Sequence, residues 1–221
     1  MRKIQYYYRG IIKPHWKNHF LQVHIGKKHL RILDVGCGND SVSSIKKICP
    51  NCYYIGVDIG DYNLGKDTKS KMDEYHIVSP ENFANKLEEF IGSIDVVISS
   101  HNIEHCNEPY QVLKNMVLDL KPGGSIYLSF PSEASVTFPN RGGTLNFYDD
   151  DTHVWLPQWK NIIKILKENH IEITYACKNY SPFLYRMIGK FHEKKSKIEG
   201  RVLKGTWAYY GFESIIWGTL R

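Results

Sequence analysis

The sequence lacks the features that would place it in a special class of protein. No apolar run approaches the length of about 20 residues that crosses a bilayer. The segment Met1 to Phe20 carries charges without the continuous apolar core of a secretory signal. Five cysteines, an odd number in a chain of 221 residues, do not indicate a disulfide framework. The pair Cys49 and Cys52 has no second pair to complete a zinc site. We therefore expect a cytoplasmic protein with reduced thiols and no membrane span.

Acidic residues are absent from the start of the chain. Met1 to His29 holds seven Lys and Arg and four His but no Asp or Glu, within a chain whose formal net charge is +6. Such a basic arm can attract the phosphate groups of a nucleotide or of a small anionic acceptor. A solvated amphipathic helix would have the same composition, so both interpretations stay open. With 42% hydrophobic and 24% charged residues, the whole chain has the composition of a folded globular protein.

Apolar runs alternate with amphipathic stretches through the middle of the chain. The pattern predicts strands, with helices between them, at 30–36, 52–59, 74–79, 93–100 and 125–130. Such alternation predicts βαβ units and a parallel sheet covered on both faces. We place this core at 30–130 in a single domain, 1–221, with a basic helical arm at 1–29. The stretches 131–153 and 179–204 are expected to be insertions on the side of the molecule that binds the substrate.

The last part of the chain continues the same alternation. The amphipathic stretch 156–169 predicts a helix, and the apolar stretch 171–177 predicts a strand. Strand-like residues return at 207–220 and are compatible with a final β-hairpin.

The motif "LDVGCGND", Leu33 to Asp40, stands at an expected strand-to-helix junction. Gly36 and Gly38 allow a sharp turn and let a ligand approach the backbone. A dinucleotide fingerprint would have a third glycine where this chain has Ser41. The carboxylate of Asp34 also suits a positively charged ligand better than a pyrophosphate. The loop therefore favours a cofactor that carries positive charge.

Further motifs follow in a fixed order. Asp58 ends the second expected strand, where a carboxylate can accept hydrogen bonds from a ribose diol, although a helix cap would also explain it. "SSHNIEH" (99–105) follows the fourth strand and "LKPGG" (120–124) precedes the fifth. In order and spacing, these motifs resemble those of class I S-adenosylmethionine-dependent methyltransferases of the small-molecule type. The resemblance covers 30–130.

The resemblance implies a fold and a cofactor. The expected fold is Rossmann-like, with a seven-stranded, mostly parallel sheet, helices on both faces and a C-terminal antiparallel strand. The expected cofactor is S-adenosylmethionine, with S-adenosylhomocysteine as the product. The implied cofactor contacts are Asp34, Gly36, Gly38, Asp58, Ile59, Ser79 and His101. Of these, the first three would line the methionine end, Asp58 would hold the ribose, Ile59 would pack on the adenine, and His101 would lie near the methyl group.

The acceptor group decides whether the site needs a base. A hydroxyl acceptor usually needs one, and a positioned base contributes about 10²–10⁴-fold in rate. The Asn-Pro-Pro-aromatic segment typical of enzymes that methylate amino groups of bases or glutamine is absent. His105 is a candidate base. Glu104 and His105 also admit a metal interpretation, because some quinone O-methyltransferases of this superfamily use a Glu-His pair there. A third possibility is that both residues brace the following helix.

The stretch "NFYDDDTHVW", 146–155, follows the fifth strand and is expected to cover the acceptor pocket. Asp151 could orient His153 as a general base. His153, Asp149 and Asp151 could instead bind a metal together with His105. Carboxylates of this run could also cap the next helix. Our prediction takes His153, Asp151 and His105 as catalytic residues and includes no metal.

The expected activity is O-methylation of a small polar acceptor, phosphorylated or nucleotide-linked and of sugar type. The loop 142–153 loosely resembles small methyltransferases encoded with bacterial surface-polysaccharide genes, which suggests a role in capsule biosynthesis. A methyltransferase acting on RNA or DNA and a non-catalytic binding protein are the alternatives. Nucleic acid is disfavoured because no appended RNA-binding module is recognisable. The sequence does not indicate an oligomeric state.

Overall fold

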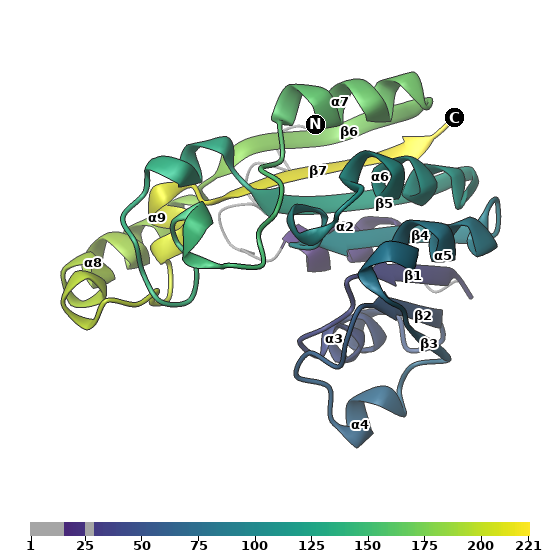
Figure 1. The fold of residues 1–221 in the computed structure, drawn as a ribbon, viewed down its shortest axis with the longest axis horizontal. Helices are drawn as coiled ribbons and strands as arrows, with labels where there is room; N and C mark the ends of the chain where they lie inside the picture. Colours follow the sequence, from purple (N-terminus) through teal and green to yellow (C-terminus); the bar gives the residue numbers. More distant parts are fainter. Residues whose placement is uncertain (1–15, 25–28) are drawn as a thin grey trace.

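The chain forms one seven-stranded sheet with helices on both faces (Figure 1). The structure, a computed structural model, describes residues 16–24 and 29–221. The strand order is β3-β2-β1-β4-β5-β7-β6. The strands are β1 (Arg31–Val35), β2 (Tyr53–Asp58), β3 (Glu74–Ile77), β4 (Ile94–Ser100), β5 (Leu120–Pro131), β6 (Ile171–Tyr180) and β7 (Glu213–Leu220). The first five are parallel, and β7 pairs antiparallel with β5 and β6. The expected Rossmann-like fold is confirmed.

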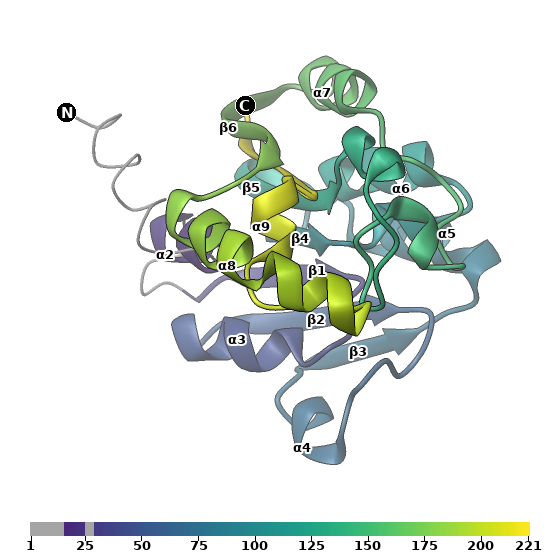
Figure 2. The same cartoon turned by 90° about the vertical axis from the view of Figure 1, so that its left-hand side faces the viewer.

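Helices cover both faces of the sheet, and others lie at its carboxyl edge (Figure 2). They are α2 (Trp16–His24), α3 (Ser41–Ile48), α4 (Lys66–Lys69), α5 (Phe83–Leu87), α6 (Pro109–Leu118), α7 (Trp159–Glu168), α8 (Phe183–Glu199) and α9 (Thr206–Tyr210). One hydrophobic core lies under α5, α6 and α7, and the other lies under α2 and α3. None of the helices that the structure describes is both long and apolar enough to span a membrane.

The central strands are apolar on both faces, which is why they were recognisable as continuous runs. In β4, Val97 belongs to the core under α5–α7, whereas Val96 and Ile98 belong to the core under α2 and α3. Successive side chains of a strand point to opposite faces, so a strand covered by helices on both sides buries every residue. Burial on both faces therefore holds the central strands in the middle of the sheet, and their ends define its carboxyl edge.

The basic stretch after β6 forms the long helix α8, and its expected place as an insertion on the substrate side stays a prediction. Two expectations for local structure were wrong. Residues 207–210, expected to be strand-like, lie in α9, and only 213–220 form a strand. The expected helix at 156–169 begins at Trp159. Of the expected basic arm at 1–29, α2 is described, and the greater part of the arm lies outside the described residues.

The carboxyl group of Asp119 is buried without a hydrogen-bond partner among the described residues. Asp119 follows α6, is fully buried, and neither carboxylate oxygen accepts a hydrogen bond from the described residues. Burial raises the pKa of this carboxyl to about 8. The unfolded value is about 3.9, so the folded state favours the protonated form. The protein therefore loses stability as the pH rises from the unfolded pKa through the folded pKa.

We expect Asp119→Asn to stabilise the protein above pH 8, because the amide has no charge to bury. A gain of about 2 kcal/mol would raise Tm by about 4–8 °C in a chain of this size. The gain should shrink as the pH falls towards about 4, where both side chains are neutral. Thermal unfolding across this pH range measures it, with the exposed Asp67→Asn as the control. Identical pH dependence in the two variants would contradict the burial argument.

Candidate active site

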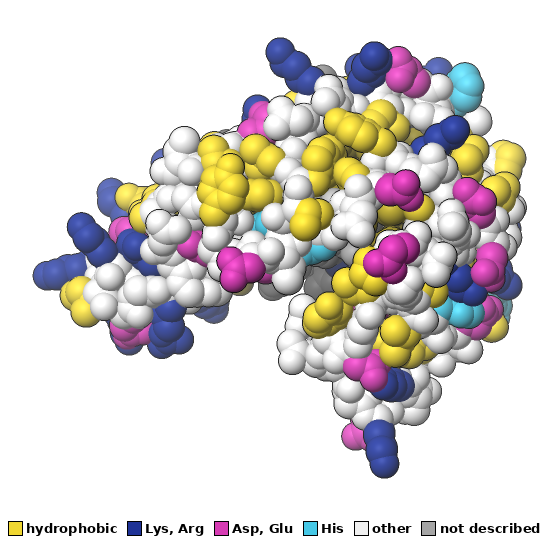
Figure 3. All heavy atoms as spheres, in the orientation of Figure 1, with side chains coloured by type: hydrophobic (Ala, Val, Ile, Leu, Met, Phe, Trp, Pro, Cys, Tyr) yellow, Lys and Arg dark blue, Asp and Glu magenta, His cyan; other side chains and the backbone are white. Residues whose placement is uncertain are grey.

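A cleft of about 720 Å³ opens at the carboxyl edge of the sheet, beside the point where the strand order reverses between β1 and β4. Ligands of open α/β sheets bind at such a point. Figure 3 shows the surface hollowed between the part that carries α9 and the part that carries α3. The walls include the loop after β1, the end of β2, the loop after β4 and the segment that follows β5.

The glycine loop forms one wall, and its sequence follows from close packing. Gly36 has φ +79°, and a Cβ there would lie 2.6 Å from the Asn102 side chain. A Cβ on Gly38 would lie 3.0 Å from Cβ of Tyr62. The Gly38 N–H donates to Oδ2 of Asp58 (2.9 Å), and the Ile59 N–H donates to Oδ1 (2.8 Å). Asp58 therefore ties this loop to the end of β2 while it lines the cleft.

Burial affects the chemistry of Asp58. Desolvation raises the pKa of its carboxyl and outweighs the backbone N–H groups of Ile59 and Gly38, which act to lower it. Each carboxylate oxygen keeps acceptor capacity beyond its backbone hydrogen bond. Asp58 can therefore receive hydroxyl groups from a ligand in the cleft.

Asp34 lies beneath the loop and not on the cleft wall. It is fully buried and accepts hydrogen bonds from the hydroxyls of Ser41 and Tyr54. Lys17 of α2 donates to Ser41 Oγ (2.5 Å) and lies 3.8 Å from the Asp34 carboxylate. Asp34 thus supports the loop, and its expected contact with the methionine end stays a prediction. Lys17, which no motif indicated, lines the cleft instead.

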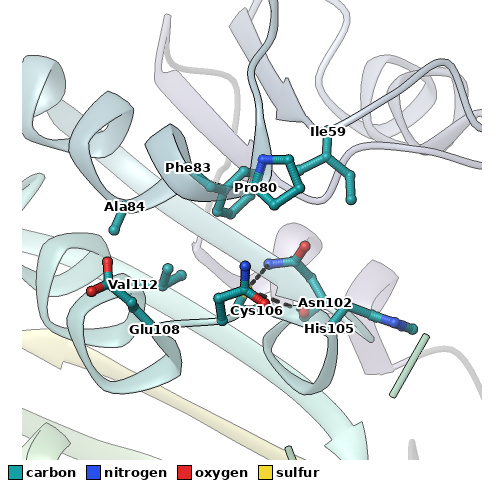
Figure 4. A pocket seen from close by; sticks show the side chains of 10 residues that line it. Ile59, Pro80, Phe83, Ala84, Asn102, His105, Cys106, Glu108 and Val112 are labelled. Atoms are coloured by element: carbon teal, nitrogen blue, oxygen red, sulfur yellow. Dashed lines mark hydrogen bonds between the residues drawn. The ribbon is translucent and has the colours of Figure 1, made fainter. Parts of the chain in front are cut away.

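A narrow, mostly apolar slot continues the cleft (Figure 4). Ile59, Pro80 and Phe83 stand on one side of it, opposite Asn102 and the start of α6. Ile59 also lines the main cleft, so the slot and the cleft are continuous. The shape and composition suit a flat heterocycle such as adenine.

Ser79 does not line this slot or the cleft. It is exposed, and its hydroxyl and carbonyl accept hydrogen bonds from Asn82, at the start of a short 3-10 turn, Pro80–Asn82. The neighbouring residue Pro80 lines the slot, where Ser79 was expected.

His101 lines the cleft as a positively charged ring. Its Nδ1 lies 3.2 Å from Oε1 of Glu104, and its Nε2 lies 3.4 Å from Oε1 of Glu213. The ring packs against Trp207 and Phe212, with centroid distances of 5.1 and 6.0 Å. Burial lowers the pKa of the imidazole, but the two carboxylates outweigh it and raise the pKa to about 10. His101 is therefore protonated at neutral pH and cannot act as a base there.

His105, Thr152 and Asp150 form a hydrogen-bonded chain along the cleft wall. Nδ1 of His105 lies 3.1 Å from the Thr152 carbonyl oxygen and 2.9 Å from its hydroxyl. The Thr152 hydroxyl donates to Oδ1 of Asp150 at 2.5 Å. Because both oxygens then accept from Nδ1–H, the proton of the neutral ring is assigned to Nδ1. Nε2 is left as a hydrogen-bond acceptor.

Asp150 remains ionised at the end of this chain. Burial raises the pKa of its carboxyl, and the hydrogen bonds from the Thr152 hydroxyl and backbone N–H are the largest effects that lower it. The net pKa is below its ordinary value. A carboxylate that orients an imidazole through a hydroxyl can do so only while it is charged.

His153 lies behind His105 and not on the cleft wall. Its side chain is 4% exposed, and its Nδ1 donates to the Phe147 carbonyl oxygen at 2.6 Å. The rings of His153 and His105 lie 4.8 Å apart. Asp151, expected to orient His153, is exposed, and the nearer carboxylate is Asp150, 4.0 Å from Nε2. The expected Asp151–His153 pair does not form, because the turn brings Asp150 to the histidine instead.

Asp149 has a structural function. It accepts hydrogen bonds from Asn140 Nδ2 and from the backbone N–H groups of Arg141, Leu145 and Asn146. With Asn146 it also forms a capping box on the 3-10 turn Phe147–Asp149. Helix α7 begins ten residues later, behind Gln158, so this carboxylate does not cap it. Asp149 fixes the loop that carries Asp150 and Thr152.

Glu104, His105 and His153 form the cluster that could hold a metal ion, with ligand atoms all within 4.8 Å of one another. Glu104 is fully buried, and neither carboxylate oxygen accepts a hydrogen bond from the described residues. One oxygen and two nitrogen donors suit zinc or another divalent transition metal. The His101 imidazolium already balances the Glu104 charge. The absence of a metal therefore stays a prediction.

Comparisons with known proteins agree with this geometry. A sequence profile described as a methyltransferase domain matches residues 4–176. The chain is 32% identical over 105 residues to a ubiquinone biosynthesis O-methyltransferase of Hydrogenovibrio crunogenus, covering 44% of this chain and 41% of that protein. It spans about half the length of the curated relatives it matches.

Solved structures share the fold. A SAM-dependent methyltransferase from Archaeoglobus fulgidus superposes with a TM-score of 0.55 at 18% identity, covering 92% of this chain and 93% of that one. A complex of the Haloferax volcanii Trm112 methyltransferase activator with a methyltransferase gives a TM-score of 0.64 at 12% identity, covering 96% and 92%. At these identities the likeness establishes the architecture alone.

We expect Asp58→Ala to weaken binding of S-adenosylhomocysteine by about 100-fold or more, because each lost hydrogen bond to a charged group is worth about 1.5–3 kcal/mol. Isothermal titration calorimetry measures the change. Asp61→Ala is the matched control, because Asp61 is an exposed acid in the same loop that pairs with Lys69. An equal affinity in the two variants would contradict the assignment of Asp58 to the ribose.

Proposed function

The chain belongs to the methyltransferase domain family, and from that premise we propose that it methylates a hydroxyl group of a small acceptor. It is an S-adenosylmethionine-dependent enzyme. S-adenosylmethionine would lie with its adenine in the slot beside Ile59 and its ribose on Asp58. Its methionine end would follow the backbone of Gly36 and Gly38. The acceptor would then enter from the side of His105 and Thr152.

The observation that carries this proposal is the hydrogen-bonded chain from His105 through Thr152 to Asp150. It leaves Nε2 of His105 as a proton acceptor at the cleft wall. In the reaction, the acceptor hydroxyl gives its proton to Nε2, and its oxygen forms a bond to the methyl carbon. When bound, S-adenosylmethionine would supply this methyl group, and its sulfur would keep the electron pair of the broken carbon–sulfur bond as a thioether. Alignment of oxygen, carbon and sulfur supplies the rest of the acceleration.

His153 and Glu104 act through their neighbours in this mechanism. His153 packs against the His105 ring and limits its rotation. The Glu104 carbonyl oxygen accepts the N–H groups of Val154 and Trp155, at 3.0 and 3.1 Å. These contacts hold the loop that follows β5 against the loop that follows β4, and they keep the base in place.

The proposed acceptor is anionic, phosphorylated or nucleotide-linked and of sugar type. Its support is the net charge of the chain, +6. A surface-polysaccharide precursor has this chemistry. Against a nucleic acid stands the size of the cleft, about 720 Å³, which suits a cofactor and one small molecule.

A phenolic acceptor is the second candidate. The curated relatives are named ubiquinone biosynthesis O-methyltransferases. In this chain, the aromatic side chains of Tyr62 and Trp207 line the cleft and could stack on an aromatic ring. A radiolabelled methyl-transfer screen with sugar nucleotides, phosphorylated sugars and catechols separates the two candidates. Labelling of RNA alone would overturn both.

We expect His105→Ala to lower kcat by about 10²–10⁴-fold with any hydroxyl acceptor found in that screen, because the proton acceptor is removed. Affinity for S-adenosylhomocysteine should stay close to that of the wild type. Added imidazole should restore part of the rate. Thr152→Val should lower kcat less, because the ring remains but loses its hydrogen-bonded support.

His29→Ala is the control for this series, because His29 is exposed and its hydrogen-bond partner among the described residues is the Asn51 carbonyl oxygen. It should retain wild-type kcat. A wild-type kcat in His105→Ala would remove His105 from the mechanism. A His105→Ala variant that no longer binds the product would indicate a role in the cofactor site instead.

We expect activity to survive dialysis against EDTA, since the mechanism above needs no metal. When bound, a divalent cation on Glu104, His105 and His153 would polarise the acceptor hydroxyl and lower its pKa. Loss of activity on chelation, with recovery on adding Zn²⁺ or Mn²⁺, would therefore assign the cluster to metal binding. Elemental analysis of the purified protein provides an independent check.

A further inference from the structure

Helix α8 is placed at the carboxyl edge of the sheet by strand pairing. β6 ends at Tyr180, and β7 begins at Glu213, which pairs with Pro131 at the carboxyl end of β5. The segment between them, which holds α8 and α9, therefore lies on the same side of the molecule as the cleft (Figures 1 and 2). Trp207 of α9 lines the cleft, while α8 lies farther out.

One face of α8 packs inward. A Cβ added to Gly189 would lie 2.1 Å from the carbonyl oxygen of Gly205, so the two backbones are in close contact. Ser196, seven residues later, is also buried and donates to the Arg201 carbonyl oxygen at 2.6 Å. Glu193, between them, reaches Arg141 and the Tyr210 hydroxyl. These contacts account for the inner face of the helix.

The opposite face carries an apolar stripe. Leu184, Met187, Phe191 and Ile198 follow one another at intervals of three, four and seven residues, which places them on one side of the helix. Phe191 is 79% exposed and Ile198 is 77% exposed. Exposed aromatic and branched side chains in a row are unusual on a free surface. Leu184 is also exposed, whereas Met187 is half-buried beside the groove described below.

A basic stripe runs beside the apolar one. Its members are three or four residues apart and all exposed: Arg186, Lys190, Lys194 and Lys197. None of these side chains forms an ion pair with the described residues. The acids of α8 are already paired, Glu193 with Arg141 and Glu199 with Lys195 and Arg201. Figure 3 shows Lys and Arg gathered over this end of the molecule.

A groove of about 660 Å³ joins the basic stripe to α9. Arg186 and Lys190 line it from α8, and Tyr209 and Tyr210 line it from α9. The guanidinium of Arg186 and the ammonium of Lys190 can hold a phosphate group through charge-assisted hydrogen bonds. The groove therefore adds a place for an anionic headgroup next to the apolar stripe.

We propose that the outer face of α8 binds the surface of an anionic lipid bilayer. The apolar stripe would enter the boundary between headgroups and acyl chains, and the basic stripe and groove would contact lipid phosphates. Helices that lie in a membrane interface combine such a stripe with flanking Lys and Arg. A second copy of this chain fits poorly, because two such faces would bring eight unpaired cations together. A nucleic acid would leave the apolar stripe in water.

The test is co-sedimentation of the full chain with vesicles. The wild type should bind phosphatidylcholine vesicles that contain phosphatidylglycerol, should bind pure phosphatidylcholine poorly, and should release at high salt. Phe191→Ser with Ile198→Ser should weaken binding by about tenfold or more, since two buried apolar side chains are lost. Lys190→Glu with Lys194→Glu should weaken it by about 30-fold or more, because two attractive charges become repulsive.

Matched controls separate the face from general surface effects. Lys160→Glu with Lys167→Glu makes the same charge change on exposed positions of α7, and Ile77→Ser with Ile91→Ser makes the same polarity change elsewhere. Both should bind vesicles almost as well as the wild type. Equal losses in controls and α8 variants, or no vesicle binding by the wild type, would overturn the proposal. So would a dimer in sedimentation that Phe191→Ser with Ile198→Ser abolishes. The readout needs no acceptor, so it is independent of the proposed reaction.

Discussion

The candidate site depends on the buried residue Glu104. Its carbonyl oxygen accepts two N–H groups from the loop after β5, and its carboxylate faces the His101 imidazolium. His101 in turn reaches Glu213 at the start of β7. Three segments that are far apart in the sequence therefore meet at one ion pair. A buried carboxylate keeps its charge only when it is paired, so the charged forms of Glu104 and His101 require each other.

This arrangement follows from the topology of the sheet. Parallel strands bring their carboxyl ends to one edge, and the antiparallel β7 begins at that same edge because it pairs with β5. The chain leaves the edge after β5 and again between β6 and β7, and both excursions approach the cleft. Thr152 and Trp207 thus line the same cleft although 55 residues separate them in the sequence. The cofactor side is formed by short turns, and the acceptor side is formed by these longer excursions.

Sequence reasoning succeeded where a short segment determines its own structure. Gly36 and Gly38 mark a turn that no larger residue could form, and continuous apolar runs mark strands buried on both faces. It failed where packing against a distant segment determines the local structure. Residues 207–210 have strand-like side chains, yet they form α9 because the chain turns there to pack on α8. In the loop 146–155, the order of three aspartates gave no means of telling which one reaches a histidine.

The sequence by itself determined the fold family, the turn at Gly36 and Gly38 and the acid at the end of β2, because these depend on local backbone geometry and on burial with a fixed period. Only the tertiary structure decided the rest of the site. It buried Asp34 beneath the glycine loop and made His101 a cation between two carboxylates. It also selected Asp150, through Thr152, as the partner of His105. Hydrogen bonds between distant segments depend on how the sheet brings them together, and that information is not present in any one motif.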